Sequence, residues 1–274
     1  MVNIRTLDLL YVVILGVVEG ITEWLPISST AHLLLFEEIL LSIKNPSIFN
    51  DNFLEVFNVV IQLGAIFAII FIYFKKLIPT KNDFRLSFWF KIFIATIPSI
   101  IIGLLFDNYI NTLFFNMITI SITLIIYGVV FIFVDRREKK IAKKSIHSCG
   151  MGTMILLGCA QALAVIPGTS RSGITIVAAL LIGFGRTDSL DVSFYMSIPV
   201  MLGASLLKVV KFNNNYIFLD SQIVLLMLGM ICAFIVSMIV VKFLINFVKK
   251  HSFKGFGYYR IILGVIILIK CLIS

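Results

Sequence analysis

EGITEWLPISSTAH, residues 19–32, interrupts the first apolar segment of the chain with two carboxylates, a proline and three consecutive hydroxyl side chains. Glu19 and Glu23 are four residues apart, so on a helix both carboxylates share one face. Pro26 is unsuited to a helix interior, and the serines after it suit the N-cap of a second helix with free backbone N–H groups. The stretch therefore predicts two short helices joined by a polar turn.

A second stretch, PGTSRSG (residues 167–173), repeats this pattern and adds a guanidinium at Arg171. The two stretches interrupt the apolar segments 7–41 and 151–185, and the pieces on either side are too short to cross a bilayer alone. Lipid cannot satisfy the peptide groups of a turn at membrane depth, so protein or water must surround it. We therefore expect two re-entrant helical hairpins whose turns line a site.

The rest of the chain is strongly apolar. Of its 274 residues, 60% are hydrophobic and only 14% are charged, which is far from the composition of a soluble domain. A helical span needs roughly 20 apolar residues. We expect one all-α membrane domain over residues 1–274, with two re-entrant hairpins and six spans at about 53–74, 88–107, 112–134, 190–210, 222–245 and 257–273.

The positive charge indicates the orientation of the spans. The net charge is +9, but Lys and Arg gather in short loops, which favours a membrane surface over nucleic acid as partner. One set of loops holds only Arg5, Lys44 and Lys211 and is expected to face outside. Both termini and the site then face outside, and the inner side holds Lys75, Lys76, Lys81, Arg85, Arg136, Arg137, Lys139, Lys140, Lys143, Lys144, Arg186, Lys249, Lys250 and Lys254.

The two halves of the chain share short matches. LGVVE (15–19) matches LGCAQ (157–161), and LGA recurs at 63–65 and 202–204. A hairpin followed by three spans reverses the direction of the next hairpin, as in inverted-topology repeats. We therefore predict repeat one at about 1–134 and repeat two at about 151–274.

The buried charges need compensation. A charge at mid-bilayer costs at least about 2.5–3.5 kcal/mol, so Glu19 and Glu23 require Arg171, His32 or a divalent cation nearby. Two positive helix ends, several hydroxyls and a guanidinium suit a diphosphate. A purely structural Glu23–Arg171 pair and a packed, neutral His32 remain alternatives, and Gln62 is either a helix-contact residue or a site ligand.

Both motifs resemble the signatures of the undecaprenyl-diphosphate phosphatase family, the bacitracin-resistance membrane proteins. The likeness extends to FNVVIQLGA (57–65) and SIPVMLGA (197–204), with Ala31 and Trp24 in place of the commoner Gly and Phe. It implies a six-span inverted-repeat bundle with two re-entrant hairpins, an outward-facing site and a divalent cation, Mg²⁺ or Ca²⁺. The residues it implies as catalytic are Glu19 and Glu23 (also the metal ligands), Ser29, His32 and Arg171, and the predicted substrate-binding residues are Ser28, Thr30, Gln62, Thr169, Ser170 and Ser172.

The expected reaction is hydrolysis of undecaprenyl diphosphate to undecaprenyl phosphate and inorganic phosphate. By resemblance, this recycles the lipid carrier for cell-wall synthesis and confers bacitracin resistance. The attacking group stays open between Ser29 activated by His32 or Glu23, His32 itself, and water directed by a carboxylate.

The rival function is an ion-coupled transporter or lipid flippase built on the same repeat. Phosphatidic-acid-type phosphatases are excluded, because no His follows Ser170-Arg171 before His251. The expected partners are the polyprenyl diphosphate and membrane lipids, with no nucleic acid, and a homodimer remains open.

Overall fold

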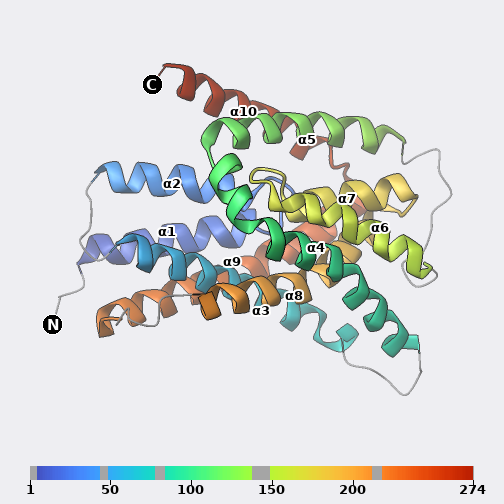
Figure 1. Ribbon diagram of the computed structural model, residues 1–274, viewed down its shortest axis with the longest axis horizontal. Helices are drawn as coiled ribbons and strands as arrows, with labels where there is room; N and C mark the ends of the chain where they lie inside the picture. Colours follow the sequence, from blue (N-terminus) through green and yellow to red (C-terminus); the bar gives the residue numbers. More distant parts are fainter. Residues whose placement is uncertain (1–4, 44–48, 78–83, 138–148, 212–217, 274) are drawn as a thin grey trace.

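The computed structural model describes residues 5–43, 49–77, 84–137, 149–211 and 218–273. These ranges fold into helices, which confirms the all-helical class (Figure 1). The helices are α1 (Thr6–Thr22), α2 (Ser29–Ile43), α3 (Asp51–Leu77), α4 (Phe84–Phe114), α5 (Met117–Arg137), α6 (Met151–Ala162), the short 3₁₀ turn η3 (Leu163–Val165), α7 (Arg171–Ile182), α8 (Arg186–Lys211), α9 (Asp220–Lys250) and α10 (Lys254–Ile273).

Six of these helices are long and apolar enough to cross a membrane: α3, α4, α5, α8, α9 and α10. They correspond one for one to the predicted spans. Many of their large apolar side chains are exposed, among them Phe71, Phe93, Ile126 and Ile239. Exposed side chains of this size are stable where lipid, not water, covers them.

One predicted boundary is wrong. The span expected at 112–134 starts too early, since residues 112–114 still belong to α4 and α5 begins at Met117. The cause is Asn116, whose Oδ1 accepts a hydrogen bond from the Thr119 backbone N–H at 2.8 Å. This is an N-cap, which fixes the start of a new helix. The apolar composition on both sides of Asn116 hides that boundary in the sequence.

The two interrupted segments form helical hairpins, α1 with α2 and α6 with α7. In Figure 1 the first hairpin extends from the left end of the molecule and the second from the right end, and their turns meet near the middle. The first turn spans residues 23–28 and the second residues 166–170. The predicted pair of helices with a polar turn is confirmed at both places.

Both turns end on a serine with a left-handed backbone. Ser28 has φ 75° and Ser170 has φ 67°, and each directly precedes the second helix of its hairpin. Each hydroxyl caps that helix: Ser28 Oγ accepts from the Ala31 N–H at 3.4 Å and Ser170 Oγ from the Gly173 N–H at 3.2 Å. Non-glycine residues in this region cost about 1–3 kcal/mol, so surrounding contacts must hold both turns in place.

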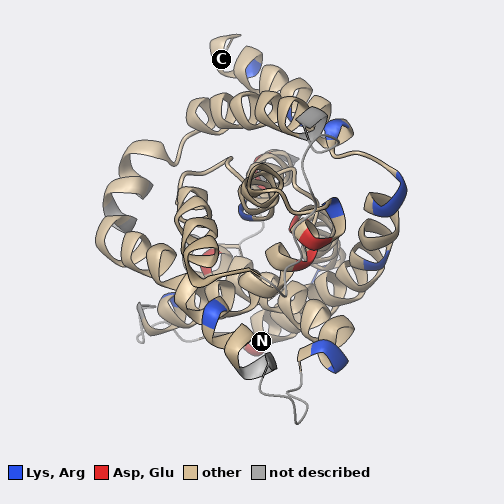
Figure 2. Ribbon diagram, turned by 90° about the vertical axis from the view of Figure 1, so that its right-hand side faces the viewer, with Lys and Arg blue, Asp and Glu red and all other residues tan. Residues whose placement is uncertain are grey.

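Several basic residues lie in the last turns of the helices. Seen from the right-hand side of Figure 1, most Lys and Arg lie around the rim of the bundle (Figure 2). Lys75 and Lys76 end α3, and Lys249 and Lys250 end α9. Several loop residues that carry the orientation prediction lie outside the described residues: Lys44, Lys81, Lys139, Lys140, Lys143 and Lys144.

Close helix packing supports the second hairpin. Helix α6 packs on α4, and an added Cβ at Gly158 would lie 2.0 Å from the Ala95 carbonyl oxygen. That approach is possible only without a side chain, as in other tight membrane helix contacts. Gly152, in the same helix, has open space at the corresponding position.

We expect Gly158→Ala to lower the stability of the protein by about 1–3 kcal/mol, because α6 must move away from α4. Gly152→Ala is the matched control and should leave stability unchanged or raise it by up to about 1 kcal/mol. Thermal unfolding of the purified variants in detergent measures both effects. Equal melting temperatures for the two variants would contradict the packing described here.

Candidate active site

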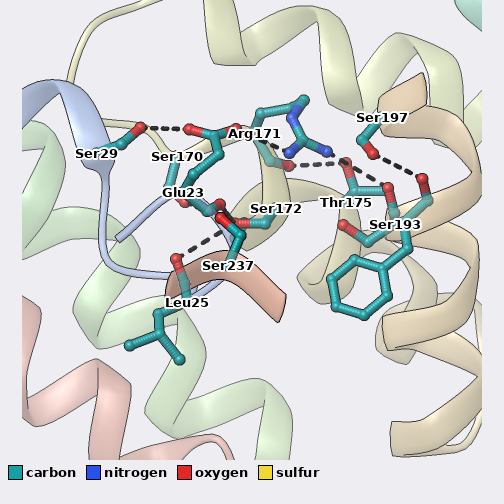
Figure 3. Close-up of polar contacts among 12 residues, drawn as sticks. Glu23, Leu25, Ser29, Ser170, Arg171, Ser172, Thr175, Ser193, Ser197 and Ser237 are labelled. Carbon is teal, nitrogen blue, oxygen red and sulfur yellow. Dashed lines mark hydrogen bonds and ion pairs between the residues drawn. The ribbon is translucent and has the colours of Figure 1, made fainter. Parts of the chain in front are cut away.

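A buried ion pair joins the two hairpins. Arg171 Nη2 lies 2.9 Å from Glu23 Oε1, and the two side chains are only 11% and 7% exposed. Glu23 directly follows α1, and Arg171 is the first residue of α7, so the pair connects the two turns (Figure 3). The expectation that Arg171 compensates Glu23 is confirmed.

The guanidinium is fixed on other sides as well. Its Nη1 donates to the Ser193 carbonyl oxygen of α8 at 3.4 Å, and its carbon lies 5.6 Å from the Trp24 ring centre. The Nε–H is buried and has no hydrogen-bond partner among the described residues. Arg171 is therefore held in position, with one guanidinium donor that has no partner among the described residues.

Ser29 completes this arrangement. Its hydroxyl donates to Glu23 Oε2 at 2.5 Å, so the carboxylate binds the arginine with one oxygen and the serine with the other (Figure 3). A hydroxyl in contact with a carboxylate has a base within reach of its proton. Ser29 begins α2, where the first backbone N–H groups have no partner within the helix and, among the described residues, only the Ala31 N–H is capped, by Ser28.

These residues border a cavity of about 310 Å³. Cavities that hold small ligands are typically about 300–1,000 Å³. The structure gathers the following predicted site residues around it: Glu23, Ser28, Ser29, Thr30, Gln62, Ser170 and Arg171. Gln62 comes from α3, so its expected place at the site agrees with the structure.

Four predicted residues do not border this cavity: Glu19, His32, Thr169 and Ser172. Ser172 lies 3.4 Å from both the Glu23 and Leu25 carbonyl oxygens, and thus ties the second hairpin to the first. The Thr169 side chain is fully buried, and its carbonyl oxygen is bound by an arginine described below. The Ser172 hydroxyl therefore supports the turns, whereas the buried Thr169 Oγ1 has no hydrogen-bond partner among the described residues.

His32 borders a second cavity, which is lined mainly by apolar side chains. Its Nδ1 is 2.7 Å from the Ser28 carbonyl oxygen, and its Nε2 is 2.7 Å from the Tyr259 hydroxyl. In the neutral ring Nδ1 donates to the carbonyl and Nε2 accepts from the tyrosine. The imidazole also stacks on the Tyr259 ring, which fits the packed-histidine alternative.

Sequence reasoning missed Arg260. This α10 residue is 0% exposed, and its guanidinium donates to the carbonyl oxygens of Pro26 at 3.1 Å, Gly168 at 2.8 Å and Thr169 at 3.0 Å. Arg260 therefore connects the two turns through their backbone carbonyl groups. The available signal was a charged residue inside the predicted span 257–273, because charges within membrane spans are rarely without a role.

The donors present fit a divalent cation. Glu19 is 2% exposed, and its Oε2 is buried without a hydrogen-bond partner in the described part of the chain. Glu23 lies one helical turn further on. No group of three or more His, Cys, Asp and Glu side chains within the described residues could hold a metal. Two carboxylates still suffice for Mg²⁺, which commonly takes its other ligands from water and substrate phosphates.

The fold and the site together define a multi-pass membrane protein with a polar cavity at the turns of two helical hairpins. Residues 12–266 match the family described as bacitracin resistance protein BacA. The chain belongs to this bacterial family.

Relatives named undecaprenyl-diphosphatase cover nearly the whole chain. The protein from Acetivibrio thermocellus is 48% identical over 96% of this chain and 97% of its own length. That from Enterococcus faecalis is 46% identical over 93% and 95%, respectively. Undecaprenyl-diphosphatase 1 of Clostridium acetobutylicum is 47% identical over 97% and 98%.

We expect Arg260→Met to lower the stability of the protein by at least about 2 kcal/mol, because it leaves three buried carbonyl groups unpaired. Arg260→Lys should be intermediate, since an ammonium keeps the charge but lacks the planar fork that reaches both turns. Lys254→Met, which removes a half-buried charge at the start of the same helix, is the control. Unfolding curves in detergent would contradict this role of Arg260 if its two variants matched the control.

Proposed function

We propose that this protein hydrolyses undecaprenyl diphosphate to undecaprenyl phosphate and inorganic phosphate, the activity for which its relatives are named. It thereby recycles the lipid carrier for cell-wall synthesis and confers bacitracin resistance, in line with its family. The observation that carries the proposal is the contact of Glu23 with both Arg171 and Ser29 at the edge of one cavity.

The cavity suits a diphosphate. Its charged donor is the Arg171 guanidinium, and Ser29, Thr30 and Ser170 add hydroxyls around it. The N-termini of α2 and α7 begin at the two turns, and helix N-termini favour anionic oxygens. Preorganised donors of this kind neutralise charge on the phosphoryl oxygens and lower the barrier to attack.

Ser29 is the proposed nucleophile and Glu23 the proposed base. The Ser29 oxygen attacks the terminal phosphorus, its proton passes to Glu23, and the bond from that phosphorus to the bridging oxygen breaks, releasing undecaprenyl phosphate. Water then attacks the phosphoserine and releases inorganic phosphate, which regenerates Ser29. The 2.5 Å contact between Ser29 and Glu23 supports this choice over His32, whose two nitrogens are bonded elsewhere.

Glu19 and Glu23 are proposed to hold a divalent cation, Mg²⁺ or Ca²⁺, together with the phosphate oxygens of the substrate. A bound cation would neutralise anionic oxygen as a Lewis acid. The buried, unpartnered Oε2 of Glu19 supports this proposal, because an uncompensated carboxylate is costly at membrane depth.

The two halves are proposed to form an inverted-topology repeat, residues 1–134 and 151–274, in a bacterial inner membrane. Two equivalent serine caps, at Ser28 and Ser170, support the repeat. The basic ends of α3 and α9 and the first residue of α8, Arg186, support a cytoplasmic location for that end of the bundle. Both termini and the substrate-accepting side of the cavity then face outside.

The activity is tested by phosphate release from a polyprenyl diphosphate in detergent. We expect Ser29→Ala and Arg171→Ala to lower kcat/KM by at least about 1,000-fold, because they remove the nucleophile and the main cationic donor. His32→Phe should lose no more than about tenfold, since His32 does not contact Ser29. Melting temperatures close to that of the wild-type protein ensure that folded protein is compared.

Other outcomes have distinct meanings. A His32→Phe variant as inactive as Ser29→Ala would overturn the Ser29–Glu23 assignment in favour of the histidine. Substrate labelled in its terminal phosphate should leave label on Ser29 after a rapid quench, and its absence would favour direct attack by water. No phosphate release by the wild-type protein, with cation-dependent uptake into vesicles instead, would identify a transporter.

The cation requirement is tested separately. Treatment with EDTA should abolish phosphate release, and added Mg²⁺ or Ca²⁺ should restore it. Glu19→Gln keeps the size of the side chain but removes its charge, so the cation concentration for half-maximal activity should rise by at least about tenfold. Full activity in EDTA would remove the cation from the mechanism.

A further inference from the structure

Gln161 is a buried amide that the catalytic scheme above does not use. It lies near the end of α6, is 1% exposed and borders the cavity that contains Glu23 and Arg171. Its Oε1 is 3.4 Å from the Thr175 hydroxyl. Its Nε2 has no hydrogen-bond partner among the described residues.

An amide nitrogen in this position is costly unless a ligand pairs with it. Buried polar groups are hydrogen-bonded in the large majority of proteins, and an unmet donor costs free energy comparable to a lost hydrogen bond. The Thr175 hydroxyl lies 3.4 Å from Oε1 and 2.8 Å from the Arg171 carbonyl oxygen. Turning the amide over would pair Nε2 with the Thr175 oxygen but leave Oε1 unpaired instead, so in either orientation one polar atom of Gln161 lacks a partner among the described residues.

The surroundings of Gln161 indicate what the ligand is. Ser99 of α4 borders the same cavity and also has a buried hydroxyl without a partner in the described part of the chain. Gln62 of α3 adds a third neutral polar side chain to the lining of this cavity, and Arg171 adds a cation. Neutral donors near one guanidinium suit a phosphoryl group, whose oxygens accept several hydrogen bonds at once.

We propose that Gln161 is a further substrate-binding residue, which donates its Nε2–H to a phosphoryl oxygen of the diphosphate held by Arg171. This assignment rests on the proposed phosphatase function and extends it. The cavity then holds the diphosphate between a charged side, formed by the two turns, and a neutral side, formed by α3, α4 and α6.

The sequence match between the two halves aligns Gln161 with an acidic residue of the first hairpin. Gln161 occupies in LGCAQ the position that Glu19 occupies in LGVVE. A carboxylate at one position accepts and can hold a cation, whereas an amide at the other donates and can hold an anion. Equivalent positions in the two hairpins thus serve opposite charges of one bound complex.

Two substitutions separate substrate binding from a structural role. Gln161→Leu removes the donor and keeps the bulk. Gln161→Glu keeps an oxygen that can face Thr175 but replaces the donor with a carboxylate beside the phosphoryl oxygens. If Gln161 only braces α6 against α7, the Glu variant should be the more active of the two. If Gln161 binds the phosphoryl group, the Glu variant should be the less active.

The control is Gln222→Leu, the same change at a buried glutamine of α9 that accepts from the Leu219 backbone N–H. With a polyprenyl diphosphate as substrate, we expect Gln161→Leu to lower kcat/KM by about 10- to 100-fold, mainly through KM. Gln161→Glu should lose more, and Gln222→Leu should match the wild-type protein. The inhibition constant for inorganic pyrophosphate, measured with the same proteins, should rise in the same order.

The results distinguish this inference from the proposed function. A wild-type protein that releases phosphate, with Gln161→Leu unchanged or Gln161→Glu more active than Gln161→Leu, overturns the role of Gln161 alone. A wild-type protein that releases no phosphate overturns the function itself. If Gln161→Leu does not fold, the pyrophosphate inhibition constant of Gln161→Glu still decides, because an unchanged constant contradicts contact with the anion.

Discussion

The whole site depends on how the peptide groups at the breaks between helices find hydrogen-bond partners within a membrane bundle. Where α1 and α6 end, the backbone leaves carbonyl and N–H groups without helical partners, and lipid offers none. The buried Arg260 guanidinium donates to three carbonyl oxygens of the turns. The hydroxyls of Ser28 and Ser170 accept from N–H groups at the start of the next helices. The Arg260 contacts join the two turns in addition to the Glu23–Arg171 ion pair and the Ser172 contacts.

The same constraint produces the chemistry. Once the turns are held together, Glu23 and Arg171 are placed side by side with little exposure to solvent, and Ser29 reaches the free carboxylate oxygen. In such surroundings charge interactions are stronger than in water. The serines with a left-handed backbone show that the turns are held in a conformation they would not adopt alone. Ser28 and Ser170, which cap the helices after the breaks, therefore also border the cavity of the proposed site.

The two arginines have different roles, and so do the polar residues of the two hairpins. Arg171 borders the cavity and has one guanidinium donor without a partner among the described residues, whereas Arg260 donates to backbone carbonyls, lies near the Tyr127 ring and supports the turns. His32 and Ser172 are residue types common in catalytic sites, but they do not border the cavity and instead stabilise the hairpins. Gln161, which looks unremarkable beside the acidic motif, faces the cavity instead.

The sequence by itself determined the helical class, the six membrane-length helices and the two hairpins, because span length, proline and hydroxyl-rich turns are local properties. It also limited the compensators of the buried acids to Arg171, His32 or a divalent cation, and the structure then placed Arg171 against Glu23. Only the tertiary structure decided that His32 turns to Tyr259, that Arg260 reaches both turns, and that α5 starts beyond Asn116. The physical reason is that the direction of a side chain depends on neighbours distant in the chain, which neither composition nor spacing specifies.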